Sequence, residues 1–159
     1  MNTLFALITA FTTPGFPTDD VIYITSLIFS PTTIFPSEAW GTSGILPLIN
    51  GSPTDFTANF IVFLGLVVPP IGALIFASLL ADKPKEAFGA IIISILLACT
   101  IYTILFGIGQ GMSAVIAQMW ADQTVLYGNL GTLIMILLGG IVNGLFYGAI
   151  GMFATKEGL

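Results

Sequence analysis

Three long tracts without any ionisable side chain constrain the fold of this 159-residue chain more than any other feature. They contain 26 residues between Asp55 and Asp82, 35 between Glu86 and Asp122, and 33 between Asp122 and Lys156. A helix needs about 20 predominantly apolar residues to cross a lipid bilayer, so each tract is long enough. The sequence therefore predicts an all-α integral membrane protein with three transmembrane helices.

The overall composition agrees with a membrane protein and excludes one class of partner. Hydrophobic residues make up 56% of the chain and charged residues only 7%, whereas a soluble domain has about 25% charged residues. The lipid bilayer is therefore the first partner that we expect. With three lysines and no arginine, the chain has almost none of the positive charge that drives binding to nucleic acid. We expect no nucleic-acid partner.

The residue types that most enzymes and metal sites use are scarce in this chain. There is no histidine to activate a serine or threonine, and the single Cys99 cannot form a disulfide or a Cys/His metal site within one chain. Two carboxylate pairs, Asp19 with Asp20 and Asp82 with Glu86, lie at expected helix starts, where the helix dipole favours acids. We interpret both pairs as helix caps, and we predict no enzymatic activity, no metal and no cofactor.

The apolar tracts define the expected domains and spans. We divide the chain into an N-terminal region, 1–51, and a three-helix transmembrane domain, 52–159, with spans at about 53–80, 86–106 and 130–154.

Capping and helix-breaking residues predict how the first two spans begin and bend. Ser52 is the expected N-cap of the first span, with Pro53 as its first residue, and Asp82 is the expected N-cap of the second. Within the first span, Pro69 and Pro70 remove two amide donors and clash with the preceding turn. We therefore predict a kink at this proline pair.

Two shorter apolar runs, Thr3–Phe11 and Val21–Phe29, occur in the N-terminal region and are too short to be comfortable spans. We expect them to form short helices lying in or near the membrane interface, followed by a loop that contains Trp40. Whether residues 1–37 cross the membrane stays open, and if both runs crossed, five spans would result. A further interfacial helix is expected at Met112–Tyr127, before the third span.

The lysines predict the orientation of the chain. Lys83 and Lys85 lie between the first two expected spans, and Lys156 lies near the C-terminus. The positive-inside rule places both segments on the cytoplasmic side. An odd number of spans then puts the N-terminus outside and the C-terminus in the cytoplasm.

The third expected span carries a repeat of glycines at a spacing of four residues. At about 100° per residue, these glycines and two polar residues lie on one helical face. Glycine lets another helix backbone approach closely, so this face should contact protein and not lipid. Two alternatives stay open: the face packs against other helices of the same chain, or it joins subunits. The face consists of Gly140, Asn143, Gly144, Tyr147, Gly148 and Gly151.

The second expected span carries another stripe of small residues, formed by Ala90, Ser94 and Ala98, which is a secondary candidate for helix packing. No ionisable side chain lies near the centre of any span, so we expect no proton relay and no voltage sensor.

These patterns together predict a non-catalytic integral membrane subunit of an oligomeric assembly, which contacts copies of itself or other membrane subunits through its small-residue faces. The first alternative is a homo-oligomeric pore or channel with walls around Ser94 and Thr103. The second alternative is a membrane-embedded structural protein of a virus or cell envelope.

Overall fold

The computed structural model describes residues 17 and 19–155, and within that part of the chain it contains helices and no strands. The all-α prediction is therefore confirmed for these residues. In chain order the elements are α2 (Val21–Phe29), η1 (Ser30–Thr32), η2 (Glu38–Thr42), α3 (Ile45–Asn50), α4 (Phe56–Leu80), α5 (Pro84–Gly109) and α6 (Ala114–Phe153).

Three helices, α4, α5 and α6, are long and apolar enough to cross a membrane, which agrees with the three expected spans. The 25 residues of α4 alone correspond to a length of about 38 Å. No further helix of that length occurs among the described residues, and the apolar run Thr3–Phe11 lies outside them.

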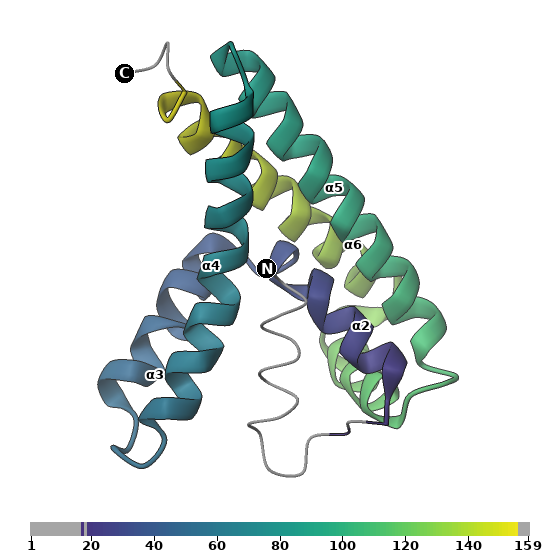
Figure 1. The fold of residues 1–159 in the computed structure, drawn as a ribbon. Coiled ribbons are helices and arrows are strands. Elements are labelled where there is room, and N and C mark those ends of the chain that lie inside the picture. Colours follow the sequence, from purple (N-terminus) through teal and green to yellow (C-terminus); the bar gives the residue numbers. More distant parts are fainter. Residues whose placement is uncertain (1–16, 18, 156–159) are drawn as a thin grey trace.

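The three long helices are arranged as a fan (Figure 1). The helices α5 and α6 lie side by side and make the most extensive helix–helix contact in the described chain. The helix α4 meets them near the end where α6 finishes and diverges from them toward its own start, where α3 runs beside it. The space between α4 and the α5–α6 pair is where the segment after α2 enters the fold.

Two of the expected helix starts are wrong by a few residues. The helix α4 begins at Phe56 with Asp55 as its N-cap, because the preceding residues form a turn in which the Asp55 amide donates to the Ser52 carbonyl at 2.9 Å. The helix α5 begins at Pro84 with Lys83 as its N-cap, not Asp82. Proline has the helical φ built in and lacks an amide hydrogen, so it favours the first helical position.

The third long helix is interrupted, as the separate predictions of Met112–Tyr127 and 130–154 imply. The helix α6 starts after Ser113, whose hydroxyl accepts from the Ile116 amide at 3.1 Å, and it has non-helical angles at Gly128 (φ 69°, ψ 168°). A positive φ strains any residue with a Cβ, so glycine is the residue that permits this break. The two helical stretches therefore have different directions although they are contiguous.

The proline pair lies in the middle of α4, at Pro69 and Pro70. Figure 1 shows that the helix changes direction about half way along its length. This agrees with the predicted kink, since two consecutive residues there have no amide to donate to the preceding turn.

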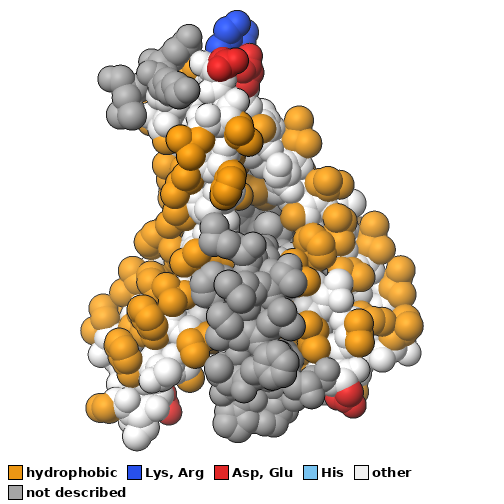
Figure 2. All heavy atoms as spheres, viewed as in Figure 1, with side chains coloured by type: hydrophobic (Ala, Val, Ile, Leu, Met, Phe, Trp, Pro, Cys, Tyr) orange, Lys and Arg blue, Asp and Glu red, His pale blue; other side chains and the backbone are white. Residues whose placement is uncertain are grey.

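Charged side chains gather at the two ends of the fan, and apolar side chains cover the visible faces of the long helices (Figure 2). The turn between α4 and α5, which contains Lys83, lies at the same end of the molecule as the C-terminal end of α6. Both lysine-bearing segments therefore begin from one end, as the orientation argument requires, although Lys156 itself lies outside the described residues.

Candidate functional site

The segment from α2 to α3 folds as a hairpin that enters between the long helices and returns. The helix α2 packs on α5, the short η1 turn contacts α4, α5 and α6, and α3 then runs back beside α4 (Figure 1). The expectation that Val21–Phe29 forms a short helix is confirmed, with the same bounds. Its expected surface position is wrong, because the segment leads inward to the middle of the third long helix.

The entrance of this hairpin is held by Asp20. One carboxylate oxygen accepts from the Tyr23 amide at 2.9 Å and so caps α2, and the other accepts from the hydroxyl of Ser113, the N-cap of α6. Burial raises the pKa of Tyr23, and the nearby Asp20 carboxylate acts in the same direction. The interpretation of Asp20 as a capping residue is confirmed, and the cap also joins two helix starts.

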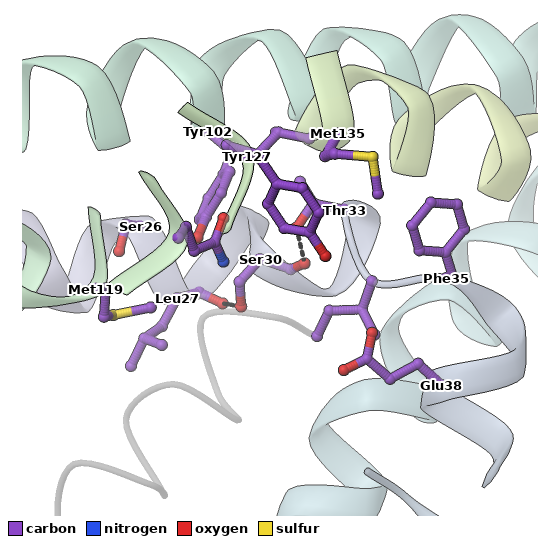
Figure 3. A pocket seen from close by; sticks show the side chains of 13 residues that line it. Ser26, Leu27, Ser30, Thr33, Phe35, Glu38, Tyr102, Met119, Tyr127 and Met135 are labelled. Atoms are coloured by element: carbon purple, nitrogen blue, oxygen red, sulfur yellow. Dashed lines mark hydrogen bonds between the residues drawn. The ribbon is translucent and has the colours of Figure 1, made fainter. Parts of the chain in front are cut away.

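The turn at the tip of the hairpin leaves carbonyl groups that a continuous helix would have satisfied. Hydroxyl groups from the same segment bond to several of them. Figure 3 shows Ser30 donating to the Leu27 carbonyl at 3.1 Å and Thr33 donating to the Ser30 carbonyl at 2.8 Å. Thr32 donates to the Phe29 carbonyl at 2.6 Å. The serine and threonine side chains of this apolar segment are thus occupied locally.

Asn143 of α6 satisfies two more carbonyls of the hairpin tip. Its side-chain nitrogen donates to the Thr32 carbonyl at 2.8 Å and to the Ile34 carbonyl at 2.6 Å. These two bonds determine the orientation of the amide, since only the nitrogen can donate. The side chain is 1% exposed, and its oxygen has no hydrogen-bond partner. A buried acceptor without a donor is rare and points to a ligand or water.

The glycine face of α6 packs within the chain. A Cβ added at Gly140 would lie 2.6 Å from the Cys99 sulfur, one at Gly148 would lie 2.9 Å from the Phe88 ring, and one at Gly151 would collide with Ile91. Gly144 is less crowded, since a Cβ there would lie 3.5 Å from Ile92.

Of the two alternatives left open for this face, packing against the same chain is what the structure contains. All four glycines and the two polar residues of the face are buried. Because α5 and the hairpin tip already cover it, the face offers no surface to another subunit.

Tyr147 connects this face to the hairpin. It is 2% exposed, packs with Leu74 and Ile95, and its hydroxyl accepts from the Trp40 indole at 3.3 Å. Trp40 lies in the one-turn π-helix η2 and not in an irregular loop.

The secondary stripe has the opposite environment. Ala90 and Ser94 are exposed on the outside of α5, and Ala98 is half-buried. The Ser94 hydroxyl has no hydrogen bond to any residue that the structure describes. The stripe therefore does not pack against the α4 or α6 side of the chain as the glycine face does.

The larger of two cavities beside the hairpin tip has a volume of about 360 Å³. We call it the hairpin cavity (Figure 3). Tyr102 and Met135 lie on it from the long helices, and the Glu38 carboxylate and the Tyr127 ring also reach it. Its lining combines hydroxyl, carboxylate and thioether groups without any histidine or cysteine.

The smaller cavity has a volume of about 160 Å³ and lies where the hairpin tip meets the kink of α4. We call it the proline cavity. Pro31 and Thr32 of η1 contribute to its wall, as does Ala73 of α4. Six of the residues selected from the sequence for separate reasons also line it, and these are Pro69, Pro70, Ser94, Ala98, Asn143 and Tyr147.

Several contacts at this site involve residues that the sequence analysis did not select. A Cβ at Gly139 would collide with the Thr33 carbonyl of the hairpin, so this glycine is as restricted as those of the repeat. Ser78 donates to the Gly151 carbonyl at 3.1 Å and joins α4 to α6. Gly139 is adjacent to the repeat, but only the position of the hairpin reveals its role.

Among the described residues, no group of three His, Cys, Asp or Glu side chains is placed to hold a metal ion. No protein-family model, no curated protein and no solved structure matches this chain.

Proposed function

We propose that the chain crosses a lipid bilayer with α4, α5 and α6 and acts as a non-catalytic subunit of an oligomeric membrane assembly. The three helices have the required length and apolarity. Large apolar side chains are exposed along all of them, including Phe76, Ile93 and Ile150, and lipid is the solvent that fits such surfaces. The charged residues lie at the ends of the fan, where the headgroups would be (Figure 2).

The observation that supports assembly is the exposed stripe of Ala90 and Ser94 on α5. Small side chains on a lipid-facing surface contribute little packing, whereas at a contact between helices they permit close approach. The glycine face of α6 is already covered within the chain. We therefore assign the proposed subunit contact to the outer stripe of α5, between the exposed Ile93 and Leu97.

The test is the mass of the purified particle in a mild detergent, compared with 16.7 kDa for one chain. We expect a multiple of this mass, or a mass that includes other subunits. Ala90→Leu adds volume to the proposed contact, and overpacking of this kind costs about 1–3 kcal/mol. That corresponds to roughly a tenfold or larger loss of association.

Ala58→Leu is the matched control, because Ala58 is an exposed position on another long helix. We expect it to leave the particle mass unchanged. A wild-type particle with the mass of one chain would contradict the proposal, as would an Ala90→Leu particle that associates as strongly as the control.

The proposed orientation has the N-terminus outside and the lysine-bearing end in the cytoplasm. It follows from the positive-inside rule and from the common position of the α4–α5 turn and the end of α6. A membrane-impermeant thiol reagent applied to intact cells should label Ser52→Cys and not Thr155→Cys. The native Cys99 is buried and does not interfere. Labelling only at position 155 would reverse the orientation.

A pore is the second candidate, because consecutive residues of the hairpin tip face two different cavities. Ser30 and Thr33 line the hairpin cavity, while Pro31 and Thr32 line the proline cavity. Non-helical backbone inside a membrane protein commonly lines a solute pathway. Reconstituted vesicles with a potassium gradient would test it: flux above that of empty vesicles, reduced by Thr103→Leu, would favour a pore, and no flux would contradict it.

A further inference from the structure

The proline cavity has an unusual combination of features for the interior of a helical protein. It is largely apolar, yet the fully buried Asn143 that lines it has a side-chain oxygen without a donor. The nitrogen of the same amide is committed to the hairpin carbonyls of Thr32 and Ile34. Rotation of the amide would sacrifice both of those bonds, so the oxygen is the atom available to a ligand.

The residues around this oxygen restrict the chemistry of the ligand. No ionisable carboxyl, amine or guanidinium group lines the cavity. A cation there would have no counter-charge, and an uncompensated buried charge is very unfavourable. A neutral hydrogen-bond donor fits the oxygen, and the remaining wall of proline, alanine and isoleucine side chains fits an apolar body.

The size and the opening of the cavity restrict the ligand further. A volume of about 160 Å³ is close to that of an engineered protein cavity of about 150 Å³ that binds benzene. Ala73 of α4 and Ser94 of α5 are exposed on its rim. Both are small, so they leave an opening between α4 and α5 on the face that the proposed topology turns toward lipid.

We infer that the proline cavity binds a small, neutral, lipophilic molecule with one hydrogen-bond donor, of the phenol or alcohol class, whose donor bonds to the Asn143 oxygen. The molecule enters from the bilayer through the opening between α4 and α5. This inference goes beyond the proposed assembly role, since it requires only the cavity of a single chain.

The test uses 4-fluorophenol and fluorobenzene, which share a ring but differ in the donor, and follows the fluorine NMR signal of each with the purified protein in mild detergent. We expect saturable binding of 4-fluorophenol, at least about tenfold tighter than that of fluorobenzene, because the donor satisfies a buried acceptor. Equal affinity for the two probes, or no saturable binding of 4-fluorophenol, would overturn the inference.

Two substitutions that fill the cavity locate the binding. Ala98→Phe from α5 and Ala73→Leu from α4 should each reduce binding at least about tenfold, whereas Leu97→Phe, on the exposed outer surface of α5, should leave it unchanged. Ala73 lies outside the proposed contact stripe. Loss of binding in Ala73→Leu with an unchanged particle mass therefore separates this inference from the assembly proposal. Unchanged binding in both cavity variants, with a wild-type helical spectrum, would place the probe elsewhere and contradict it.

Discussion

The α5–α6 pair and the region between α4 and the hairpin are built in two different ways. Along α5 and α6, glycine lets side chains such as Cys99 and Phe88 lie directly against the opposing backbone. Between α4 and the hairpin, a kinked helix meets a non-helical turn, and hydrogen bonds from Asn143 and local hydroxyl groups satisfy the freed carbonyls. One contact is closed and apolar, and the other contains polar groups and a cavity.

The difference teaches which kind of change each region tolerates. Lipid removes the hydrophobic driving force between helices, so a glycine contact depends on close van der Waals packing and is sensitive to added volume. A non-helical segment in the same surroundings depends on the satisfaction of its backbone groups and is sensitive to the loss of a donor. Substitutions that add volume and substitutions that remove donors should therefore have different effects in the two regions.

The largest effect is expected at Asn143, the donor to the hairpin tip. Asn143→Leu keeps a similar volume but leaves the carbonyls of Thr32 and Ile34 without their donor, and a buried unsatisfied group costs about 1–3 kcal/mol. We expect a loss of about 2–4 kcal/mol in the free energy of unfolding, measured by titration from mild detergent into SDS.

Asn59→Leu is the control for this change. Asn59 is half-buried near the start of α4 and donates a single bond to the Pro47 carbonyl at 3.1 Å. Its substitution should cost less than about 1.5 kcal/mol. Equal losses at the two positions would mean that the hairpin tip does not depend on its donor more than the outer turn does.

The next largest effect concerns added volume where the two regions meet. A Cβ at Gly139 would collide with the Thr33 carbonyl, which is backbone and cannot move aside as a flexible side chain can. Gly139→Ala should therefore cost about 1–3 kcal/mol in the same titration. Gly144→Ala is the matched change, because a Cβ there would be in ordinary contact with Ile92 at 3.5 Å.

We expect Gly144→Ala to be neutral or to stabilise the protein slightly, since alanine is the better helix former by about 1 kcal/mol. If Gly139→Ala were as well tolerated as Gly144→Ala, the hairpin tip would have to lie farther from α6 than the structure indicates.

The long helices and the hairpin differ also in how far the sequence predicts them. Length without charge predicts α4, α5 and α6, because a spanning helix needs little more than uninterrupted apolarity. The bounds of Val21–Phe29 follow from Asp20 and from the prolines and turn residues beyond it. The inward course of that helix could not be predicted, because it depends on Asn143, 111 residues beyond Thr32 in the chain.

The candidate site shows the same division. The glycine repeat and the proline pair stand out in the sequence because each departs from ordinary helix composition. That Pro69, Ser94 and Asn143 line one cavity depends on the crossing of four segments, which local patterns do not encode. Gly139 is one more glycine in a glycine-rich helix until the position of the Thr33 carbonyl is known.

A smaller effect is expected at the point where the hairpin is tied to the α5–α6 pair. Asp20→Ala removes the cap of α2 and the partner of the Ser113 hydroxyl, and loss of a cap typically costs about 1–2 kcal/mol. Asp19→Ala should have little effect, since Asp19 is exposed. Hydrogen exchange of the α2 amides should increase in Asp20→Ala and not in Asp19→Ala. The same exchange in both variants would show that this cap does not hold the hairpin.

The smallest effect is expected where α4 comes closest to behaving like the α5–α6 pair. Ser78 is 3% exposed and donates to the Gly151 carbonyl, so it joins α4 to α6 at the end of the fan where they meet. Hydrogen bonds between helices in membrane proteins contribute about 0.6 kcal/mol on average. Ser78→Ala should therefore cost about that amount. Thr100→Ala is the control, because the Thr100 hydroxyl is exposed and donates only to the Leu96 carbonyl of its own helix. Its loss should be close to zero. A loss well above 1.7 kcal/mol for Ser78→Ala, the largest value measured for such bonds, would mean that α4 depends on this one bond for its position. The distinction between a closely packed pair and a loosely attached third helix would then have to be abandoned.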